Sequence, residues 1–253
     1  MTGNTFFIGA PKCGSTSLWN LFRRHPDIFV SETKETMHFI KDYWKGDSEY
    51  FKTLEGKGDK PLFDFQPNHC LYPYAAERIE MTVGKFRAVM MVREPISRAY
   101  SEMCHFSKMR PGRLSPDFDS IIRWNMLNFD DNLFSDEGEY MMQADPRGGC
   151  YRPVFLENSC YANHYGRFSN YNMIVLNYHS FIDHKIDSAN HLCDLLGLEH
   201  FARGTQFPWL NSKTDNKYFS DETVRDLRHF FKPHNERLSE LAGADFEDLW
   251  YGE

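Results

Sequence analysis

Residues 5–18 read TFFIGAPKCGSTSL, and this stretch decides the fold class of the 253-residue chain. Its first five residues form a short apolar run without alternation, which is typical of a strand buried on both faces of a parallel sheet. A turn containing Gly14 follows, and residues 15–24 then predict a helix with apolar side chains on one face. A strand, a glycine-containing loop and a helix in this order open a nucleotide-binding α/β domain.

Outward from this stretch, the chain alternates apolar runs with helical patterns. The run FRAVMMV at 86–92 is the clearest buried strand and NMIVLNY at 172–178 is the next; 28–30 and 62–65 are further candidates. Helices are predicted at 74–83, 95–106, 118–129, 158–168, 188–196 and 220–241. The alternation predicts an α/β domain of three layers, with a central, mostly parallel sheet flanked by helices.

The length is compatible with one large domain, and we expect a single domain over residues 1–253. The stretch 108–153 is less regular and rich in turn residues, so we expect it to be an insertion or a lid over the site. Hydrophobic residues make up 41% of the chain, which is ample for a substantial core and incompatible with disorder. The sequence does not predict an oligomeric state.

The composition excludes several functional classes. Lys and Arg total 29 against 36 Asp and Glu, a net charge of −7 that argues against a general nucleic-acid binder. No apolar run reaches the length that crosses a bilayer, so no membrane segment is predicted. The six cysteines have no zinc-like spacing, and we expect free thiols in the cytoplasm, with a Cys150–Cys160 bridge as the exception. A Golgi-lumenal domain is the alternative if the chain is a piece of a longer protein.

The loop at residues 9–16 reads GAPKCGST and matches a triphosphate-binding P-loop, G-x-x-x-x-G-K-[ST], at both glycines. Ser15 stands where that motif has its lysine, and Lys12 lies inside the loop. Main-chain N–H groups and the start of the following helix still form an anion cradle. The loop therefore predicts a phosphate-bearing ligand but disfavours ATP hydrolysis or kinase chemistry. The alternative is a turn that merely joins strand and helix.

Four stretches carry a resemblance to a known family. IGAPKCGSTSL at 8–18, followed by HPDI, resembles the 5′-phosphosulfate loop of sulfotransferases that use 3′-phosphoadenosine 5′-phosphosulfate (PAPS). The similarity is closest to the carbohydrate branch, which includes the heparan sulfate N- and 3-O-sulfotransferases. VREPISRAYS at 92–101 resembles its 3′-phosphate motif. KETMHF at 34–39 and SKTDNKY at 212–218 resemble its K-E-x-H-F and S-K-G-R-K-Y segments, each with one extra residue.

The resemblance implies that PAPS is the co-substrate. The residues implied to bind its 5′-phosphosulfate are those of the loop: Lys12, Cys13, Gly14, Ser15, Thr16 and Ser17. Lys213, Lys217 and Tyr218 would cover the phosphosulfate and the adenine; the alternative is a solvated basic turn.

The 3′-phosphate of PAPS would be held by Arg93 and Ser101. Arg93 falls at the carboxyl end of a predicted strand, where α/β folds place their ligands. A guanidinium fork with a hydroxyl is a natural clamp for a phosphate monoester. The alternative is that Arg93 holds a carboxylate such as Glu94 or Asp64.

Catalysis of sulfuryl transfer is expected, by analogy with phosphoryl transfer, to rest on positioning and charge stabilisation. By resemblance, Lys12 neutralises charge on the departing nucleotide and Glu35 takes the acceptor proton. Because an extra residue separates Glu35 from His38, His38 is the alternative base, with an ordinary pKa near neutrality. Lys12 and Glu35 each follow a candidate strand, so both are expected at one edge of the sheet. No metal is implied.

The resulting expectation is an enzyme of the EC 2.8.2 type that moves a sulfuryl group from PAPS, in line and without metal, to a hydroxyl or amine. The acceptor would be a carbohydrate or a small molecule; basic residues suited to a polyanion are few, namely Arg98, Lys108, Arg110 and Arg113. The alternatives are a P-loop-type nucleotide kinase and a non-catalytic nucleotide-binding module. The sequence does not distinguish O- from N-sulfation.

Overall fold

The structure is a computed structural model that describes residues 3–133, 154–208 and 219–252. The chain divides into two compact units, each built from two separate stretches of sequence. The first unit comprises Met1–Val92 with Arg167–Ser212, and the second comprises Arg93–Gly166 with Lys213–Glu253.

The first unit is built on a four-stranded sheet. In spatial order its strands are β2 (Phe63–Phe65), β1 (Asn4–Gly9), β3 (Phe86–Val92) and β4 (Ile174–Asn177). All three neighbouring pairs are parallel; Phe7 lies opposite both Phe65 and Val89. Phe7 is fully buried, as the unalternating apolar pattern predicts. The prediction of a central parallel sheet is therefore confirmed.

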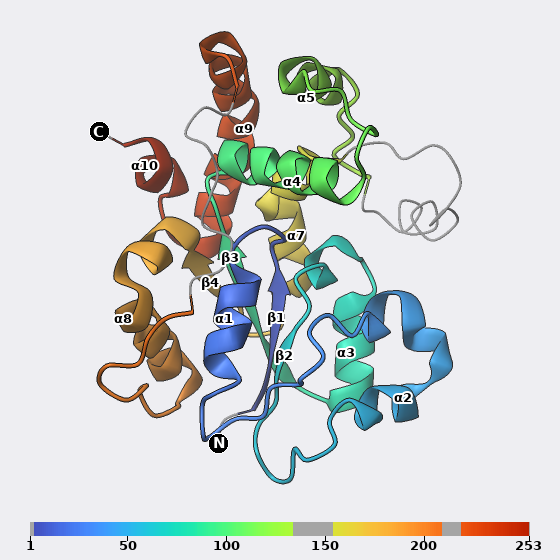
Figure 1. Cartoon of the computed structure of the whole chain (residues 1–253), viewed down its shortest axis with the longest axis vertical. Helices are drawn as coiled ribbons and strands as arrows, with labels where there is room; N and C mark the ends of the chain where they lie inside the picture. Colours follow the sequence, from blue (N-terminus) through green and yellow to red (C-terminus); the bar gives the residue numbers. More distant parts are fainter. Residues whose placement is uncertain (1–2, 134–153, 209–218, 253) are drawn as a thin grey trace. The chain divides into compact units, whose positions relative to one another are not determined.

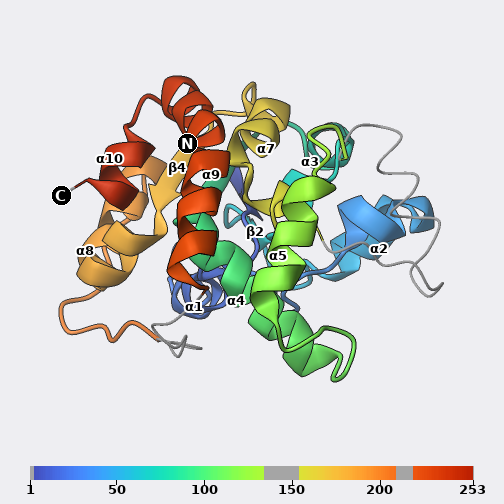
Figure 2. The ribbon, with the colours of Figure 1, turned by 90° about the horizontal axis from the view of Figure 1, so that it is seen from above.

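Helices cover both faces of this sheet. The chain moves from β1 to β2 in one direction and from β2 to β3 in the other, so right-handed crossovers place their helices on opposite faces. Figures 1 and 2 show α1 and α3 on opposite sides of the sheet, which confirms the three-layer prediction. The α-helices described in this unit are α1 (Ser15–Phe22), α2 (Asp47–Lys52), α3 (Ala75–Val83) and α8 (Tyr178–Leu196).

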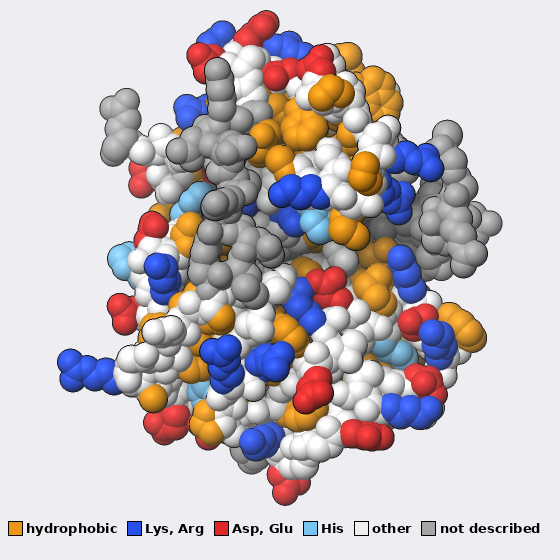
Figure 3. All heavy atoms as spheres, viewed as in Figure 1, with side chains coloured by type: hydrophobic (Ala, Val, Ile, Leu, Met, Phe, Trp, Pro, Cys, Tyr) orange, Lys and Arg blue, Asp and Glu red, His pale blue; other side chains and the backbone are white. Residues whose placement is uncertain are grey.

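The second unit is helical where it is described. The α-helices described in it are α4 (Pro95–Met109), α5 (Phe118–Leu127), α9 (Asp221–Ala242) and α10 (Phe246–Tyr251), together with most of α7 (Tyr161–Phe168). Its core includes Ile96, Met103, Ile122, Phe155, Leu227 and Phe231. Hydrophobic side chains also reach the surface over α4 and α5, where Leu127 is 86% exposed (Figure 3).

Several predicted boundaries differ from the structure. The candidate strand at 28–30 is wrong, because only Phe29 makes an isolated parallel bridge, to Leu62. The helix predicted from 188 is the second part of α8, which begins at Tyr178 and is interrupted at Lys185 (φ 38°). At its start the Asn177 side chain accepts a hydrogen bond from the His179 N–H. The helices α2 and α10 were not predicted.

The predicted insertion at 108–153 is partly helical. The end of α4 and the whole of α5 fall within it, and residues 134–153 lie outside the described part of the chain. Its role as a lid stays a prediction. None of the described helices combines the length and apolar composition that crossing a bilayer requires.

Candidate active site

The loop between β1 and α1 is anchored at the carboxyl edge of the sheet. The Ala10 N–H donates to the Met91 carbonyl oxygen at 2.9 Å, which holds the start of the loop on β3. The chain then turns through Lys12 (φ 69°) and Gly14 (φ 81°), and α1 begins at Ser15. The eight-residue helix points its N-terminus, with its main-chain N–H groups and positive dipole end, toward the loop.

Two glycines make the loop geometry possible. A Cβ atom on Gly14 would lie 3.1 Å from a ring carbon of Tyr178, and the positive φ of Gly14 is strained for other residues. A Cβ atom on Gly9 would collide with the Cys70 thiol. Tyr178, the first residue of α8, was missed by sequence reasoning; its position at the carboxyl end of a predicted strand was the available clue.

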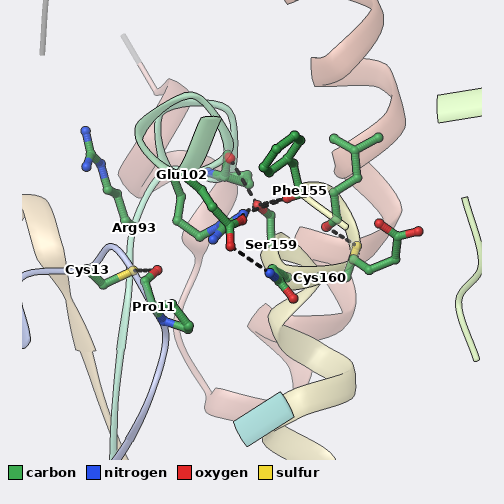
Figure 4. A network of polar contacts seen from close by, with 12 residues as sticks. Pro11, Cys13, Arg93, Glu102, Phe155, Ser159 and Cys160 are labelled. Atoms are coloured by element: carbon green, nitrogen blue, oxygen red, sulfur yellow. Dashed lines mark hydrogen bonds and ion pairs between the residues drawn. The ribbon is translucent and has the colours of Figure 1, made fainter. Parts of the chain in front are cut away.

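The side chains of the loop are buried to different degrees. Cys13 is fully buried and its Sγ donates to the Pro11 carbonyl oxygen at 3.6 Å (Figure 4), so its thiol faces the protein. Ser15 and Ser17 are buried, while Lys12 and Thr16 are half-buried. Main-chain N–H groups at the start of α1 are the donors that this loop offers to an anion.

Glu35 lies next to the end of β2. Its N–H donates to the carbonyl oxygen of Phe65, the last residue of β2, at 3.2 Å. The expectation that Glu35 directly follows a strand is wrong, but the hydrogen bond brings it to the same sheet edge as the loop after β1. The Glu35 side chain is 40% exposed and is paired with the Lys34 ammonium.

His38 points away from solvent. Its ring stacks on that of Tyr50, with centroids 5.3 Å apart, and its Nε2 lies 3.8 Å from Asp47 Oδ1. Burial lowers the pKa of His38, although the nearby Asp47 carboxylate opposes this effect. The chain accommodates the extra residue between Glu35 and His38 through the positive φ of Met37 (59°) and a π-helix over His38–Asp42. Of the two candidate bases, Glu35 carries the accessible side chain.

A cluster of titratable groups lies in the core beside His38. The Asp64 carboxylate accepts a hydrogen bond from the Tyr50 hydroxyl at 3.0 Å, and burial raises the pKa of Asp64 to about 6. Burial lowers the pKa of His69 to about 3. Asp64 and His69 are only 3% and 0% exposed, so we assign them to the core and not to the site.

In the second unit, Arg93 is 7% exposed and its Nε donates to Ser97 Oγ at 2.9 Å. The Glu94 carboxylate caps α4, accepting from the Ile96 and Ser97 N–H groups at 2.9 and 2.7 Å. The other carboxylate considered as a partner of Arg93, that of Asp64, accepts a hydrogen bond from the Tyr50 hydroxyl at 3.0 Å. Ser101 is half-buried one helical turn after Ser97.

The Arg98 side chain has a structural role and does not lie at the surface. It is fully buried, and its guanidinium donates to Ser159 Oγ at 2.6 Å, to the Phe155 carbonyl oxygen at 2.6 Å and to Glu102 at 2.7 Å. The Asn158 side chain also donates a hydrogen bond to Glu102, at 2.9 Å. Figure 4 shows Glu102, Phe155 and Ser159 grouped around this network. The reading of Arg98 as a basic residue available to an acceptor is therefore wrong.

The structure groups the predicted site residues within each unit. Lys12, the loop residues, Glu35 and His38 belong to the first unit, and Arg93 and Ser101 belong to the second. Three predicted residues lie outside the described ranges: Lys213, Lys217 and Tyr218. Cys150 also lies outside them, and Cys160 is a free thiol that donates to the Leu156 carbonyl oxygen. Within the described ranges no group of three or more side chains is suited to hold a metal ion.

Comparisons with known proteins find sulfotransferases that are similar to this chain. No protein-family model matches the chain. Mouse heparan sulfate glucosamine 3-O-sulfotransferase 3A1 is 24% identical over 94% of this chain, which spans 62% of that protein's length. A sulfotransferase from Alicyclobacillus acidocaldarius superposes with a TM-score of 0.72 over 99% of both chains, at 19% identity. Mouse sulfotransferase SULT7A1 complexed with PAP has a TM-score of 0.55, at 15% identity, over 93% of this chain and 85% of its own.

Proposed function

We propose that the chain is a sulfotransferase, similar to the carbohydrate branch of that family, and that it transfers a sulfuryl group from PAPS to a hydroxyl or amine. The observation that carries the proposal is the loop between β1 and α1. It has the glycines and helix N-terminus of a phosphate cradle, with Ser15 in place of the lysine of a triphosphate site.

The nucleotide would be bound at both of its ends. Main-chain N–H groups of residues 12–17 bind the 5′-phosphosulfate, while Arg93 and Ser101 bind the 3′-phosphate. The Nε bond to Ser97 supports this role for Arg93, because it fixes the plane of the guanidinium. Lys213, Lys217 and Tyr218 are proposed to cover the phosphosulfate and the adenine.

The reaction is an in-line displacement at sulfur. The acceptor oxygen or nitrogen attacks the sulfur, and the bond from sulfur to the bridging phosphate oxygen breaks. The departing nucleotide is 3′-phosphoadenosine 5′-phosphate (PAP). Glu35 takes the proton of the acceptor, and the Lys12 ammonium neutralises the charge that builds on the bridging oxygen. We propose transfer without a metal, because Lys12 supplies this charge.

The acceptor is proposed to be a carbohydrate or a small alcohol or amine. The net charge of −7, with Lys and Arg interspersed among Asp and Glu on the viewed face (Figure 3), does not favour a polyanion over a neutral acceptor. We propose a cytoplasmic location, with a Golgi-lumenal catalytic domain as the alternative.

Calorimetry with PAP and with ATP–Mg²⁺ tests the nucleotide. We expect PAP to bind more tightly, with an affinity that magnesium does not change; tighter binding of ATP–Mg²⁺ would favour a kinase and overturn the proposal. A screen of acceptors with radiolabelled PAPS then separates the enzyme from a non-catalytic binding module. Transfer of label to any acceptor supports the enzyme, and binding of PAP without transfer across sugars, alcohols and amines favours the module.

A further inference from the structure

The link between β3 and α4 is only two residues long, Arg93 and Glu94. Main-chain groups in such a link lie outside the regular hydrogen bonds of strand and helix, and when buried they need other partners. The Tyr161 hydroxyl is the hydrogen-bond partner of both main-chain groups of Arg93, its N–H and its carbonyl oxygen. It accepts from the Arg93 N–H at 3.4 Å and donates to the Arg93 carbonyl oxygen at 2.8 Å. Tyr161 is 1% exposed, so these bonds lie in the core of the second unit.

A second tyrosine hydroxyl holds Glu94. Tyr251, the last residue of α10, donates to Glu94 Oε1 at 2.5 Å, while the same carboxylate caps α4. Trp250 packs near the Tyr161 ring, with centroids 6.2 Å apart, and Arg228 covers the Tyr251 ring at 4.8 Å. The helices α7 and α10 therefore meet at the same two-residue link.

The side chain of Arg93 is tied to the same arrangement. Its Nε donates to Ser97 Oγ, and Ser97 Oγ in turn donates to the Glu94 carbonyl oxygen at 2.9 Å. In Figure 4 the Arg93 side chain points away from Glu102 and Ser159, so it does not join the buried network of Arg98. The direction of the guanidinium thus depends on how the peptide groups of the link are held.

We propose that Tyr161 and Tyr251 are positioning residues that aim Arg93 at the 3′-phosphate of the nucleotide. This inference rests on the proposed function, in which Arg93 contacts that phosphate and neither tyrosine touches the ligand. Its consequence is specific: loss of either hydroxyl weakens recognition of the 3′-phosphate and leaves the rest of the nucleotide site unchanged.

Calorimetry of Tyr161→Phe and Tyr251→Phe with PAP and with adenosine 5′-monophosphate tests this, because the two ligands differ by the 3′-phosphate. Each variant keeps its ring. We expect Tyr161→Phe to lower PAP affinity about 3–10-fold, the scale of one net hydrogen bond, with unchanged affinity for the monophosphate. Tyr251→Phe should also lower PAP affinity and leave the affinity for the monophosphate unchanged. Tyr165→Phe, on the same helix as Tyr161, is the matched control and should change neither affinity.

A double variant shows whether the effect passes through Arg93. In an Arg93→Ala background, Tyr161→Phe should cause no further loss of PAP affinity, since coupled residues are not additive. Equal losses for PAP and the monophosphate, or full additivity with Arg93→Ala, would show a merely structural role and overturn the inference. A wild-type chain that binds both nucleotides equally would instead overturn the proposed function itself, and this inference with it. Thermal unfolding of each variant confirms that it is folded.

Discussion

Glu35 and His38 show how one extra residue separates two candidate bases. The positive φ angles of Glu35 and Met37 and the π-helix that follows turn His38 into the aromatic cluster of Phe39, Tyr43 and Tyr50. The Glu35 carboxylate stays exposed at the carboxyl edge of the sheet. At this scale, accessibility distinguishes the two residues better than their ordinary pKa values do.

We expect Glu35→Gln to lower turnover about 10²–10⁴-fold, the usual contribution of a general base, with PAPS affinity nearly unchanged. His38→Phe keeps an aromatic ring against Tyr50 and should retain near-normal turnover. Steady-state kinetics with the best acceptor, together with calorimetry of PAP, measure both effects. Retained turnover in Glu35→Gln combined with its loss in His38→Phe would move the base to His38.

Gly14→Ala should destabilise the folded chain by about 1–2 kcal/mol through its positive φ, and should also weaken PAP binding. The added methyl would press on the Tyr178 ring and shift the phosphate loop. Gly56→Ala is the matched control, because Gly56 has φ 84° with open space around its position. Chemical denaturation and calorimetry of both variants test this. Equal PAP affinity in the two variants would show that the Tyr178 contact does not shape the loop.

At the scale of elements, the sequence predicts β1 and β3 to within one residue, because short unbroken apolar runs are typical of buried strands. The run at 28–30 has the same character but is too short to form more than one bridge. The first ten residues of α8 were not predicted because most of their side chains are polar and because Lys185 (φ 38°) interrupts the helix before the predicted part. The π-helix was not predicted because no residue spacing marks it.

In the candidate site, features that depend on neighbouring residues can be predicted, and features that depend on distant contacts cannot. The loop around Lys12 and the motif around Arg93 can be proposed from the sequence, because the residues of each are neighbours in the chain. The burial of Arg98 was beyond sequence reasoning, since two of its partners, Phe155 and Ser159, lie 57 and 61 residues away. The hydrogen bond of Glu35 to Phe65 was equally hidden. Long-range contacts decide these environments, and local patterns do not report them.

Pro233 lies inside α9 and lacks the N–H that would donate to the carbonyl oxygen of His229, four residues earlier. We expect Pro233→Ala to stabilise the second unit by about 1–3 kcal/mol, because it restores this bond and relieves the ring's clash. Urea denaturation monitored by circular dichroism measures the change. Lys232→Ala, an exposed neighbour, should stay within about 0.5 kcal/mol of wild type. A destabilised Pro233→Ala would show that the fold requires a bend at this point.

At the scale of the whole molecule, buried titratable groups set the pH dependence of stability. The ring nitrogens of His69 have no hydrogen-bond partner among the described residues, and burial lowers the pKa of His69 from 6.5 to about 3. The unfolded chain binds a proton there below pH 6.5, which the folded chain does not bind until about pH 3. The contribution of neutral His69 is therefore present above pH 6.5 and is lost progressively as the pH falls.

His69→Phe removes this proton linkage and keeps an aromatic ring beside Phe6 and Phe39. Its free energy of unfolding minus that of wild type should rise by about 1.4 kcal/mol for each unit by which the pH falls from 6.5 to about 3. Urea denaturation at several pH values measures the difference, in which the opposite effect of Asp64 cancels. The exposed His184→Gln control should parallel wild type. A constant difference across the range would show that folded His69 titrates normally.

The discontinuity of both units has a kinetic consequence during synthesis. The strand β4 emerges from the ribosome only after the whole stretch Arg93–Gly166 has been made. Until then the edge of β3 that pairs with β4 has no partner strand. The link at Arg93 and Glu94 lacks the hydrogen bond from Tyr251 to Glu94 for longer still, because Tyr251 is synthesised after α9. Contacts this distant in sequence fold slowly, and an unpaired strand edge invites aggregation. The nascent chain therefore has an extended period in which a chaperone that shields the edge of β3 would raise the yield of native protein.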